Sequence, residues 1–317
     1  MKQTRAALCV LLCLALLAPC AALAQSAPVP QPPPSVVRVV ELPAQMDFWA
    51  LDKRLLVFCV PVGAQDCYLV VCDGHAMMVD CASVGRAPVT DYLFRLLKAL
   101  HIDKLDYALN THPHRDHYNG FAELLSAVPT DEFLTVFPLK YDKFQRQLIR
   151  DVSATGVPIR EYVPGDPLPL GDAIISTYRF RRSKNVNDLS LVVRVQYGER
   201  AVLLTADILL KAQRKMAQEY GSLWKADILK LPHHGIGGLA KELYDTVQPE
   251  ICFASNGETS HSVKLMRKFL EKRGTPLFFT SRRALALLTD GRTWEVQQWG
   301  EDSIQLPDYT YVPEPSV

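Results

Sequence analysis

Three histidines and one aspartate lie within six consecutive positions of the segment Thr111-His-Pro-His-Arg-Asp-His117. Residues two apart in an extended segment point to the same side, so His112 and His114 are expected to point together. Asp116 and His117 should approach them from a turn into a helix. Imidazole and carboxylate groups together suit Zn²⁺, Mn²⁺ or Fe. Because the 317 residues include only eight histidines, this density indicates a metal site and not a chance polar loop.

The N-terminal residues have the order typical of a secretory signal peptide. Lys2 and Arg5 precede an uncharged apolar run that ends in small residues at Ala24. We therefore predict a signal peptide at residues 1–24, with export to a secreted, periplasmic or cell-surface location. The alternative is an uncleaved anchor, because the uncharged stretch approaches the length of a membrane span. No other segment of the sequence is predicted to cross a membrane.

The rest of the chain divides by composition. Residues 25–53 are rich in proline and predict an extended linker, and residues 303–317 predict a loose tail. The intervening residues, 54–302, are enough for one large α/β domain. Lys plus Arg number 35 against 34 Asp plus Glu, so no strong basic field indicates a nucleic-acid-binding protein.

Five cysteines lie beyond the leader, at positions 59, 67, 72, 81 and 252. In an oxidising compartment, one or two disulfides among the first four are one interpretation. The alternative is that these cysteines are small buried apolar residues in strands. Their spacing does not indicate a metal-binding motif.

Apolar runs alternate with helical patterns along the central part of the chain. Strands are predicted at 55–61, 67–72, 76–79, 105–109, 190–197, 200–205 and 228–231, with a closing hairpin at 284–299. Helices are predicted at 90–100, 120–128, 143–151, 209–220 and 262–272. This order suggests a mixed α/β fold with two sheets.

Further possible ligands follow predicted strands. Asp207 follows the strand at 201–205, although an aspartate there is often a helix cap. His233 and His234 follow the strand at 228–231, beside a glycine that allows a sharp turn.

Asp80 also ends an apolar strand and could equally be a hydrogen-bonded turn residue. Asp80, the segment 112–117, Asp207 and His234 occur in the order of the ligand motifs of the metallo-β-lactamase superfamily, which this chain resembles. The segments 187–193, 203–208 and 229–235, with His261, more narrowly resemble the soluble metallo-β-lactamase-like domain of bacterial competence (ComEC) proteins. The resemblance covers about residues 55–300.

This resemblance implies an α/β (α+β) fold, the four-layer αβ/βα sandwich of the metallo-β-lactamases, with one or two divalent metal ions, Zn or Mn, at one edge. It implies that a first metal is held by His112 and His114, a second by Asp116, His117 and His234, and that Asp207 bridges them. His233 would be either a ligand or a residue that positions one, and Asp80 would order the histidine segment. Where many members have a further histidine for the first metal, this chain has Asn187 and Asp188, so the first metal would be weakly held or bound only with substrate.

A metal-bound water with a pKa near 7 would serve as a hydroxide nucleophile. Asp116 would also accept a proton, and His261 would contact a phosphate or protonate a leaving group, unless it is only an exposed residue at a helix start. We predict an exported metal-dependent hydrolase with phosphodiesterase or nuclease-like activity on a small-molecule, nucleotide or nucleic-acid phosphodiester. The alternatives are hydrolysis of an ester, lactone or other carbonyl substrate, and a metal-stabilised binding protein with little turnover.

Overall fold

The computed structural model describes residues 37–39, 51, 53–83 and 89–298. The predicted signal peptide at 1–24, most of the predicted linker at 25–53 and the predicted tail at 303–317 lie outside the described residues. Over the described ranges, every helix is too short or too polar to cross a lipid bilayer.

Two sheets make up the centre of the described domain. The first has the strand order β1-β16-β15-β2-β3-β4-β5-β6-β7 and the second the order β14-β13-β12-β11-β10-β9-β8. The strands of the first sheet are β1 (Val37–Val39), β2 (Leu55–Cys59), β3 (Cys67–Cys72), β4 (His75–Cys81), β5 (Leu105–Asn110), β6 (Thr130–Thr135), β7 (Ile159–Glu161), β15 (Leu285–Thr289) and β16 (Trp294–Gln298). Those of the second are β8 (Pro169–Leu170), β9 (Ala173–Arg179), β10 (Leu191–Tyr197), β11 (Arg200–Leu204), β12 (Ile228–Lys230), β13 (Ile251–Ala254) and β14 (Leu277–Phe279).

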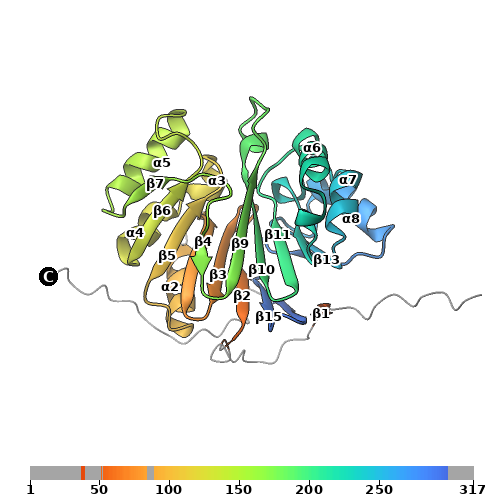
Figure 1. The fold of residues 1–317 in the computed structure, drawn as a ribbon, viewed down its shortest axis with the longest axis horizontal. Coiled ribbons are helices and arrows are strands. Elements are labelled where there is room, and N and C mark those ends of the chain that lie inside the picture. The colour runs from red at the N-terminus through yellow and green to blue at the C-terminus, as the bar shows by residue number, and fades with distance from the viewer. Residues whose placement is uncertain (1–36, 40–50, 52, 84–88, 299–317) are drawn as a thin grey trace, which may run out of the picture. The chain divides into compact units, whose positions relative to one another are not determined.

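Helices cover the outer face of each sheet (Figure 1). The α-helices are α2 (Val89–Ala99), α3 (Arg115–Tyr118), α4 (Phe121–Ala127), α5 (Lys143–Ser153), α6 (Leu210–Tyr220), α7 (Lys241–Val247) and α8 (Lys264–Glu271). The 3₁₀-helices are η1 (Asn187–Leu189), η2 (Gly221–Trp224), η3 (His233–Gly235) and η4 (His261–Val263). Helices α2, α4 and α5 lie outside the first sheet, and α6, α7 and α8 lie outside the second. The predicted four-layer arrangement is confirmed.

The buried positions of β2 explain why this sequence forms an inner strand. Successive side chains of a strand point to opposite faces, and both faces of β2 are covered. Leu56 and Phe58 pack in the core beneath the helices of the first sheet. Leu55 and Val57 pack in the core between the two sheets. The strand was predicted to reach Pro61 but ends at Cys59, because proline has no amide hydrogen to continue the ladder.

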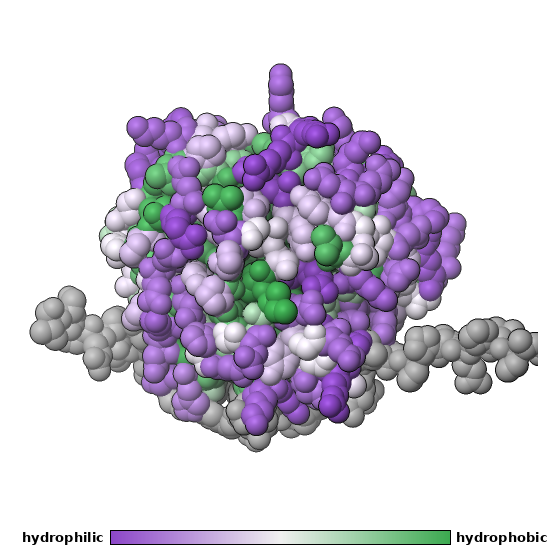
Figure 2. Space-filling model, in the orientation of Figure 1, coloured by the Kyte–Doolittle hydropathy of each residue, from purple (hydrophilic) through white to green (hydrophobic). Residues whose placement is uncertain are grey.

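A third core lies between the second sheet and α6, α7 and α8, and includes Trp224 and Met216. Figure 2 shows that apolar residues on the visible face are interspersed with hydrophilic ones. The five cysteines of the domain are all buried and form no disulfide, so they are the small buried strand residues of the second interpretation.

Parallel pairing brings several strand ends to one edge of the domain. β4, β5 and β6 are parallel neighbours in the first sheet, and β11, β12, β13 and β14 are parallel neighbours in the second. Carboxyl ends of parallel strands meet at the same edge of a sheet, which is where ligand sites of α/β proteins commonly lie. The segments that follow β5, β11 and β12 contain the predicted ligands.

Candidate metal centre

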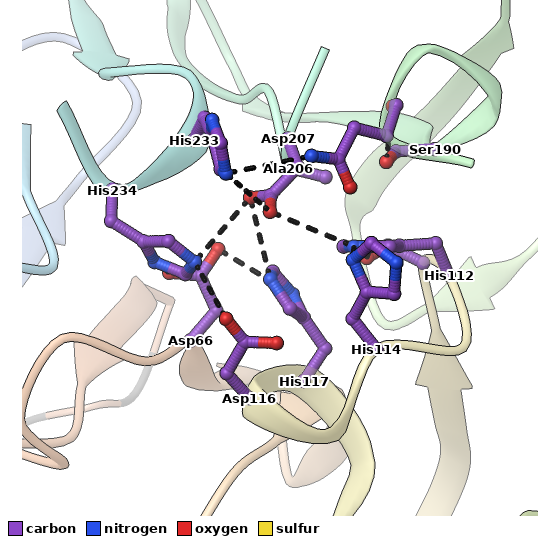
Figure 3. Close-up of polar contacts among 12 residues, drawn as sticks. Asp66, His112, His114, Asp116, His117, Ser190, Ala206, Asp207, His233 and His234 are labelled. Atoms are coloured by element: carbon purple, nitrogen blue, oxygen red, sulfur yellow. Dashed lines mark hydrogen bonds and ion pairs between the residues drawn. The ribbon is translucent and has the colours of Figure 1, made fainter. Parts of the chain in front are cut away.

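The six predicted ligands come together from three segments that are distant in the sequence (Figure 3). After β5 the chain bends at residues 111–113, which include His112, and His114 is extended before α3, which carries Asp116 and His117. The prediction that the segment is extended from His112 to His114 is therefore wrong at His112. Asp207 follows β11, and His234 lies in η3 after β12. His112, His117, Asp207 and His234 are buried, whereas the Asp116 side chain is 43% exposed.

One cluster of ligand atoms surrounds Oδ1 of Asp207. That oxygen lies 3.3 Å from Nε2 of His117 and 3.6 Å from Nε2 of His234. Nε2 of His234 is in turn 3.4 Å from Oδ2 of Asp116. Two ligand atoms about 2.1 Å from one tetrahedral ion are about 3.4 Å apart, so these separations fit a shared metal.

Three atoms of this cluster have no hydrogen-bond partner although they are buried. They are Oδ1 of Asp207, Nε2 of His117 and Nε2 of His234. A buried polar atom without a partner is costly and calls for an explanation such as an ion. Because all three face one another, the residues present fit a divalent cation at this position.

A second cluster lies on the other side of the same carboxylate. Oδ2 of Asp207 is 3.6 Å from Nε2 of His112, which is 3.1 Å from Nδ1 of His114. These three residues form one of the two groups of possible metal ligands found in the described part of the chain. Asp207 therefore directs one oxygen toward each cluster, the arrangement that a bridging ligand would need.

His233 lies beside this second cluster. Its Nε2 is 3.8 Å from Oδ2 of Asp207 and 3.4 Å from Nδ2 of Asn187. Like Asp116, it belongs to neither group of possible ligands found in the described residues, but its Nε2 already contacts the side-chain nitrogen of Asn187. Of the two interpretations of His233, the geometry favours the one in which it positions the centre and does not bind metal directly.

Asp66 is part of the centre and was not predicted. Its Oδ1 is 3.1 Å from Nδ1 of His234 and accepts a hydrogen bond from Ser255. Its Oδ2 is 2.5 Å from Nζ of Lys230. Asp66 lies close enough to His117, Asp207 and His234 to be a possible ligand. A cation bound directly by Asp66 would, however, be repelled by the Lys230 ammonium. We assign Asp66 to orienting His234 from the far side of its ring.

Asp80 has the corresponding position behind His117. Its Oδ2 is 2.7 Å from Nδ1 of His117, and it also accepts hydrogen bonds from the backbone N–H and hydroxyl of Thr111 and the side chain of Asn110. The expectation that Asp80 orders the histidine segment is confirmed by these contacts. A carboxylate on Nδ1 directs Nε2 of each ring toward the ion.

Strained backbone is concentrated at the centre. Asp80, Ala206, His233 and His234 have φ values of 55°, 44°, 51° and 53°. Such values are unfavourable for residues other than glycine and persist where the surroundings enforce them, often at functional sites. The carbonyl of Ala206 accepts hydrogen bonds from the backbone N–H of His233 and from Nζ of Lys230. These contacts hold the turn that carries Asp207.

The carboxylates and imidazoles shift one another's pKa values. Burial alone would raise the pKa of Asp207, but His234 and His117 outweigh burial and hold it well below its usual range. Burial opposes a charge on His234, yet Asp207 and Asp66 raise its pKa to about 9. His117 is likewise raised, against burial, by Asp207 and Asp80. A cation that binds Nε2 of both rings must therefore replace protons held there in the metal-free protein.

His112 and Asp116 differ from the other ligands. Burial and the adjacent His117 hold the pKa of His112 well below its usual value, so its ring is neutral and available to a metal. Burial would raise the pKa of Asp116, but the adjacent His234 and the charge of His117 lower it to about 2. Both residues thus have the charge state that metal binding requires.

His261 is not brought into the centre by any side-chain contact. It is exposed at the start of η4, and within the described part of the chain no side-chain hydrogen bond or ion pair joins it to the predicted ligands. Arg282 and Arg283 are exposed beyond β14. His261 follows β13, and Arg282 and Arg283 follow β14, so all three lie near the edge of the second sheet that carries the metal centre, outside the centre itself.

The comparisons with known proteins agree with this geometry. The family model described as "Metallo-beta-lactamase superfamily" matches residues 60–246, which is more than half of the chain. The chain belongs to the metallo-β-lactamase superfamily. This membership makes it an enzyme of the metal-dependent hydrolase class, and the family binds one or two metal ions.

Two curated proteins are similar in sequence to part of this chain. ComE operon protein 3 of Bacillus subtilis is 25% identical over 171 residues, which is 53% of this chain and 22% of that protein. Competence protein ComA of Neisseria gonorrhoeae is 24% identical over 188 residues, 58% of this chain and 25% of that protein. The match thus spans a quarter or less of each relative.

A solved structure supports the fold. The metallo-beta-lactamase fold protein YhfI of Bacillus subtilis has a TM-score of 0.51 and 15% identity, with 73% of this chain and 99% of that one covered. At this identity the likeness shows the shared fold alone.

Proposed function

We propose that this chain is an exported metal-dependent phosphodiesterase. The observation that carries the proposal is the pair of ligand clusters that share Asp207, with three buried ligand atoms left without partners. The likeness to two proteins named for competence favours a phosphodiester over a carbonyl substrate. Since only a fraction of those proteins is matched, the likeness supports the type of chemistry and no more.

Each ligand has a role in this proposal. His112 and His114 hold a first metal, and Asp116, His117 and His234 hold a second, with Asp207 between them. The second metal has four protein groups and the first has three, so the first retains more open coordination positions. Structural metal sites are typically closed by four protein ligands, and catalytic sites keep a position open. We therefore propose that the substrate binds at the first metal. We propose Zn or Mn as the metal in both positions.

When bound, two divalent ions lower the pKa of a water to about 7 and neutralise charge on a phosphoryl oxygen. The chain's own groups prepare for this chemistry. Asp66 and Asp80 hold the rings of His234 and His117 in place. Asp116 is the ligand residue with a solvent-exposed carboxylate and is placed to accept a proton. His233 and Asn187 line the side of Asp207 that faces the first metal.

Phosphodiesters are expected to be hydrolysed faster than β-lactams or simple lactones, because two metals can neutralise charge on both sides of the phosphoryl group. Initial rates with bis-p-nitrophenyl phosphate, nitrocefin and a simple lactone, each with added Zn²⁺ or Mn²⁺, measure this preference. Carbonyl hydrolysis faster by a hundredfold would replace the proposal with the ester or lactone alternative. No turnover of any substrate by a metal-loaded protein would contradict it.

The purified protein is expected to bind one to two equivalents of a transition metal. The site formed by Asp116, His117, His234 and Asp207 should fill before the site at His112 and His114, because it has four ligand groups. Elemental analysis combined with a metal titration monitored by calorimetry measures both. Binding should remain at the level of the parent protein in Asp103→Ala, which changes an exposed carboxylate outside both clusters, and should fall in His117→Ala. Failure of the parent protein to bind Zn²⁺ or Mn²⁺ would exclude the centre.

The proposal includes the domain division predicted from the sequence, with a signal peptide at 1–24 and a linker at 25–53 before the metallo-β-lactamase-like domain at 54–302. We expect the exported form to begin near Gln25. N-terminal sequencing of protein recovered outside the cytoplasm tests this. A start at Met1 in the membrane fraction would instead support an uncleaved anchor.

A further inference from the structure

A cavity of about 660 Å³ lies outside the metal centre and has no role in the function proposed above. It extends along β14, the edge strand of the second sheet, and beyond the end of β13. Gln298 of β16 contributes from the first sheet. The cavity therefore lies where the margins of the two sheets meet.

The cavity lies next to the metal centre at the same edge of the second sheet. β12, β13 and β14 are parallel neighbours, and their ends lead into His234, Asn256 and Ser281. Adjacent strands are about 4.8 Å apart, so the cavity begins roughly 5–10 Å from His234. Hydrogen bonds connect the three ends directly. Asn256 donates its side-chain N–H to the carbonyl of His234 at 3.1 Å, and Ser281 donates its backbone N–H to the carbonyl of Asn256 at 3.2 Å.

The lining combines cationic, hydroxyl and aromatic groups. Arg282 and Arg283 are exposed, and Glu258 is the one carboxylate among the described lining residues. The net charge of the lining is therefore positive. Arginine side chains and hydroxyls bind phosphate oxygens, often in pairs.

One aromatic side chain, Phe278, is half-buried at the cavity and packs toward the core between the two sheets, whereas the next residue of β14, Phe279, packs on the opposite face toward the helices. Aromatic rings that remain partly exposed beside arginine are surfaces on which nucleic-acid bases stack. A purely carbonyl substrate would require neither the positive charge nor the flat surface.

We propose that this cavity binds the nucleoside and its adjoining phosphate on one side of the scissile bond. The preferred substrate is then a nucleotidyl phosphodiester, and Arg282, Arg283 and Phe278 determine that preference. This inference rests on the proposed phosphodiesterase function and specifies its substrate. The 5–10 Å between His234 and the cavity corresponds to the step from a phosphate to its neighbouring base or phosphate.

Two substrates that release the same product test the assignment. Thymidine 3′-phosphate 5′-(p-nitrophenyl phosphate), the thymidine ester, carries a nucleoside and a phosphate that adjoins it beyond the scissile one, and bis-p-nitrophenyl phosphate carries neither. In Arg282→Ala/Arg283→Ala we expect KM for the thymidine ester to rise about tenfold or more, with KM for bis-p-nitrophenyl phosphate changed less than about twofold. Phe278→Ala should show the same selectivity. The control Arg146→Ala/Arg150→Ala removes the same charge from the exposed face of α5, outside the other sheet, and should match the parent protein.

A binding measurement separates this inference from the proposed function. Thymidine 5′-phosphate is titrated into the metal-loaded parent and variant proteins by calorimetry. At least tenfold weaker binding by the Arg282→Ala/Arg283→Ala protein supports the cavity even if no phosphodiester is hydrolysed. Equal binding by parent and variant overturns it, as does an equal rise in KM for both esters. Hydrolysis of bis-p-nitrophenyl phosphate by a parent protein that binds no thymidine 5′-phosphate overturns the cavity alone.

Discussion

Asp207→Asn is expected to reduce hydrolysis by on the order of 10³-fold or more while the protein remains folded. Asp207 is the one residue whose two oxygens face both clusters, at 3.3 Å from His117 and 3.6 Å from His112. The amide of asparagine is neutral and offers only one acceptor atom, so both metals should be weakened together. Turnover of bis-p-nitrophenyl phosphate and metal content by elemental analysis measure the two effects.

The matched control is Asp103→Asn, which makes the same chemical change at an exposed position between α2 and β5. It should leave both turnover and metal content at the level of the parent protein. Far-ultraviolet circular dichroism verifies that the Asp207→Asn protein is folded. Near-parental turnover by Asp207→Asn at saturating metal would show that Asp207 does not bridge, and the two-metal arrangement would have to be abandoned.

The candidate ligands were predicted from the family resemblance, and the sequence pattern agrees with it because Asp207 and His234 each follow an apolar strand. Asp207 and His234 lie at the carboxyl ends of β11 and β12, which are parallel neighbours. Parallel pairing places residues that follow neighbouring strands at the same edge of the sheet, independent of the length of the intervening loops. The helical turn at Asp116 and His117 was also predicted, and α3 begins at Arg115, but the bends at residues 111–113 that carry His112 were not predicted.

The residues that orient the ligands could not be predicted in the same way. Asp66 lies before β3, after a glycine-containing loop, where an aspartate usually indicates only a turn. Its contact with His234 spans 168 positions and depends on how the two sheets meet. No local pattern contains that information. The pairing of β15 with β2, which completes the first sheet, is equally long-range.

Lys230 could have indicated a buried ion pair from the sequence alone. It lies within the apolar strand β12 and is fully buried. Lysine is almost never fully buried unless it is paired. A charged residue between apolar neighbours in a strand therefore predicts a buried carboxylate partner elsewhere in the chain, although it does not identify that partner as Asp66.

Lys230→Met is expected to lower the free energy of unfolding by about 3–5 kcal/mol, because it leaves the buried charge of Asp66 without its nearest cation. For a domain of this size that loss corresponds to a fall in Tm of roughly 6–20 °C. The lysine also donates at 3.0 Å to the carbonyl of Ala206, whose strained turn positions Asp207. The substitution also removes a positive charge 3.9 Å from Oδ1 of Asp207, so the change in metal affinity is the net of a disturbed turn, which weakens binding, and a lost repulsion, which strengthens it. Thermal unfolding of the metal-free protein, followed by a metal titration, measures both.

Two comparisons distinguish a buried ion pair from a general loss of packing. Lys104→Met removes an ammonium that lies 2.6 Å from Asp131 at the exposed surface, and it should leave Tm close to that of the parent protein. Lys230→Met combined with Asp66→Asn should cost less than the sum of the two single substitutions, since no buried charge is then left alone. Strict additivity would mean that the pair does not interact. In that case Lys230 would support the Ala206 turn through its hydrogen bond alone, and Asp66 would have to be balanced by His234 and His117, which also lower its pKa.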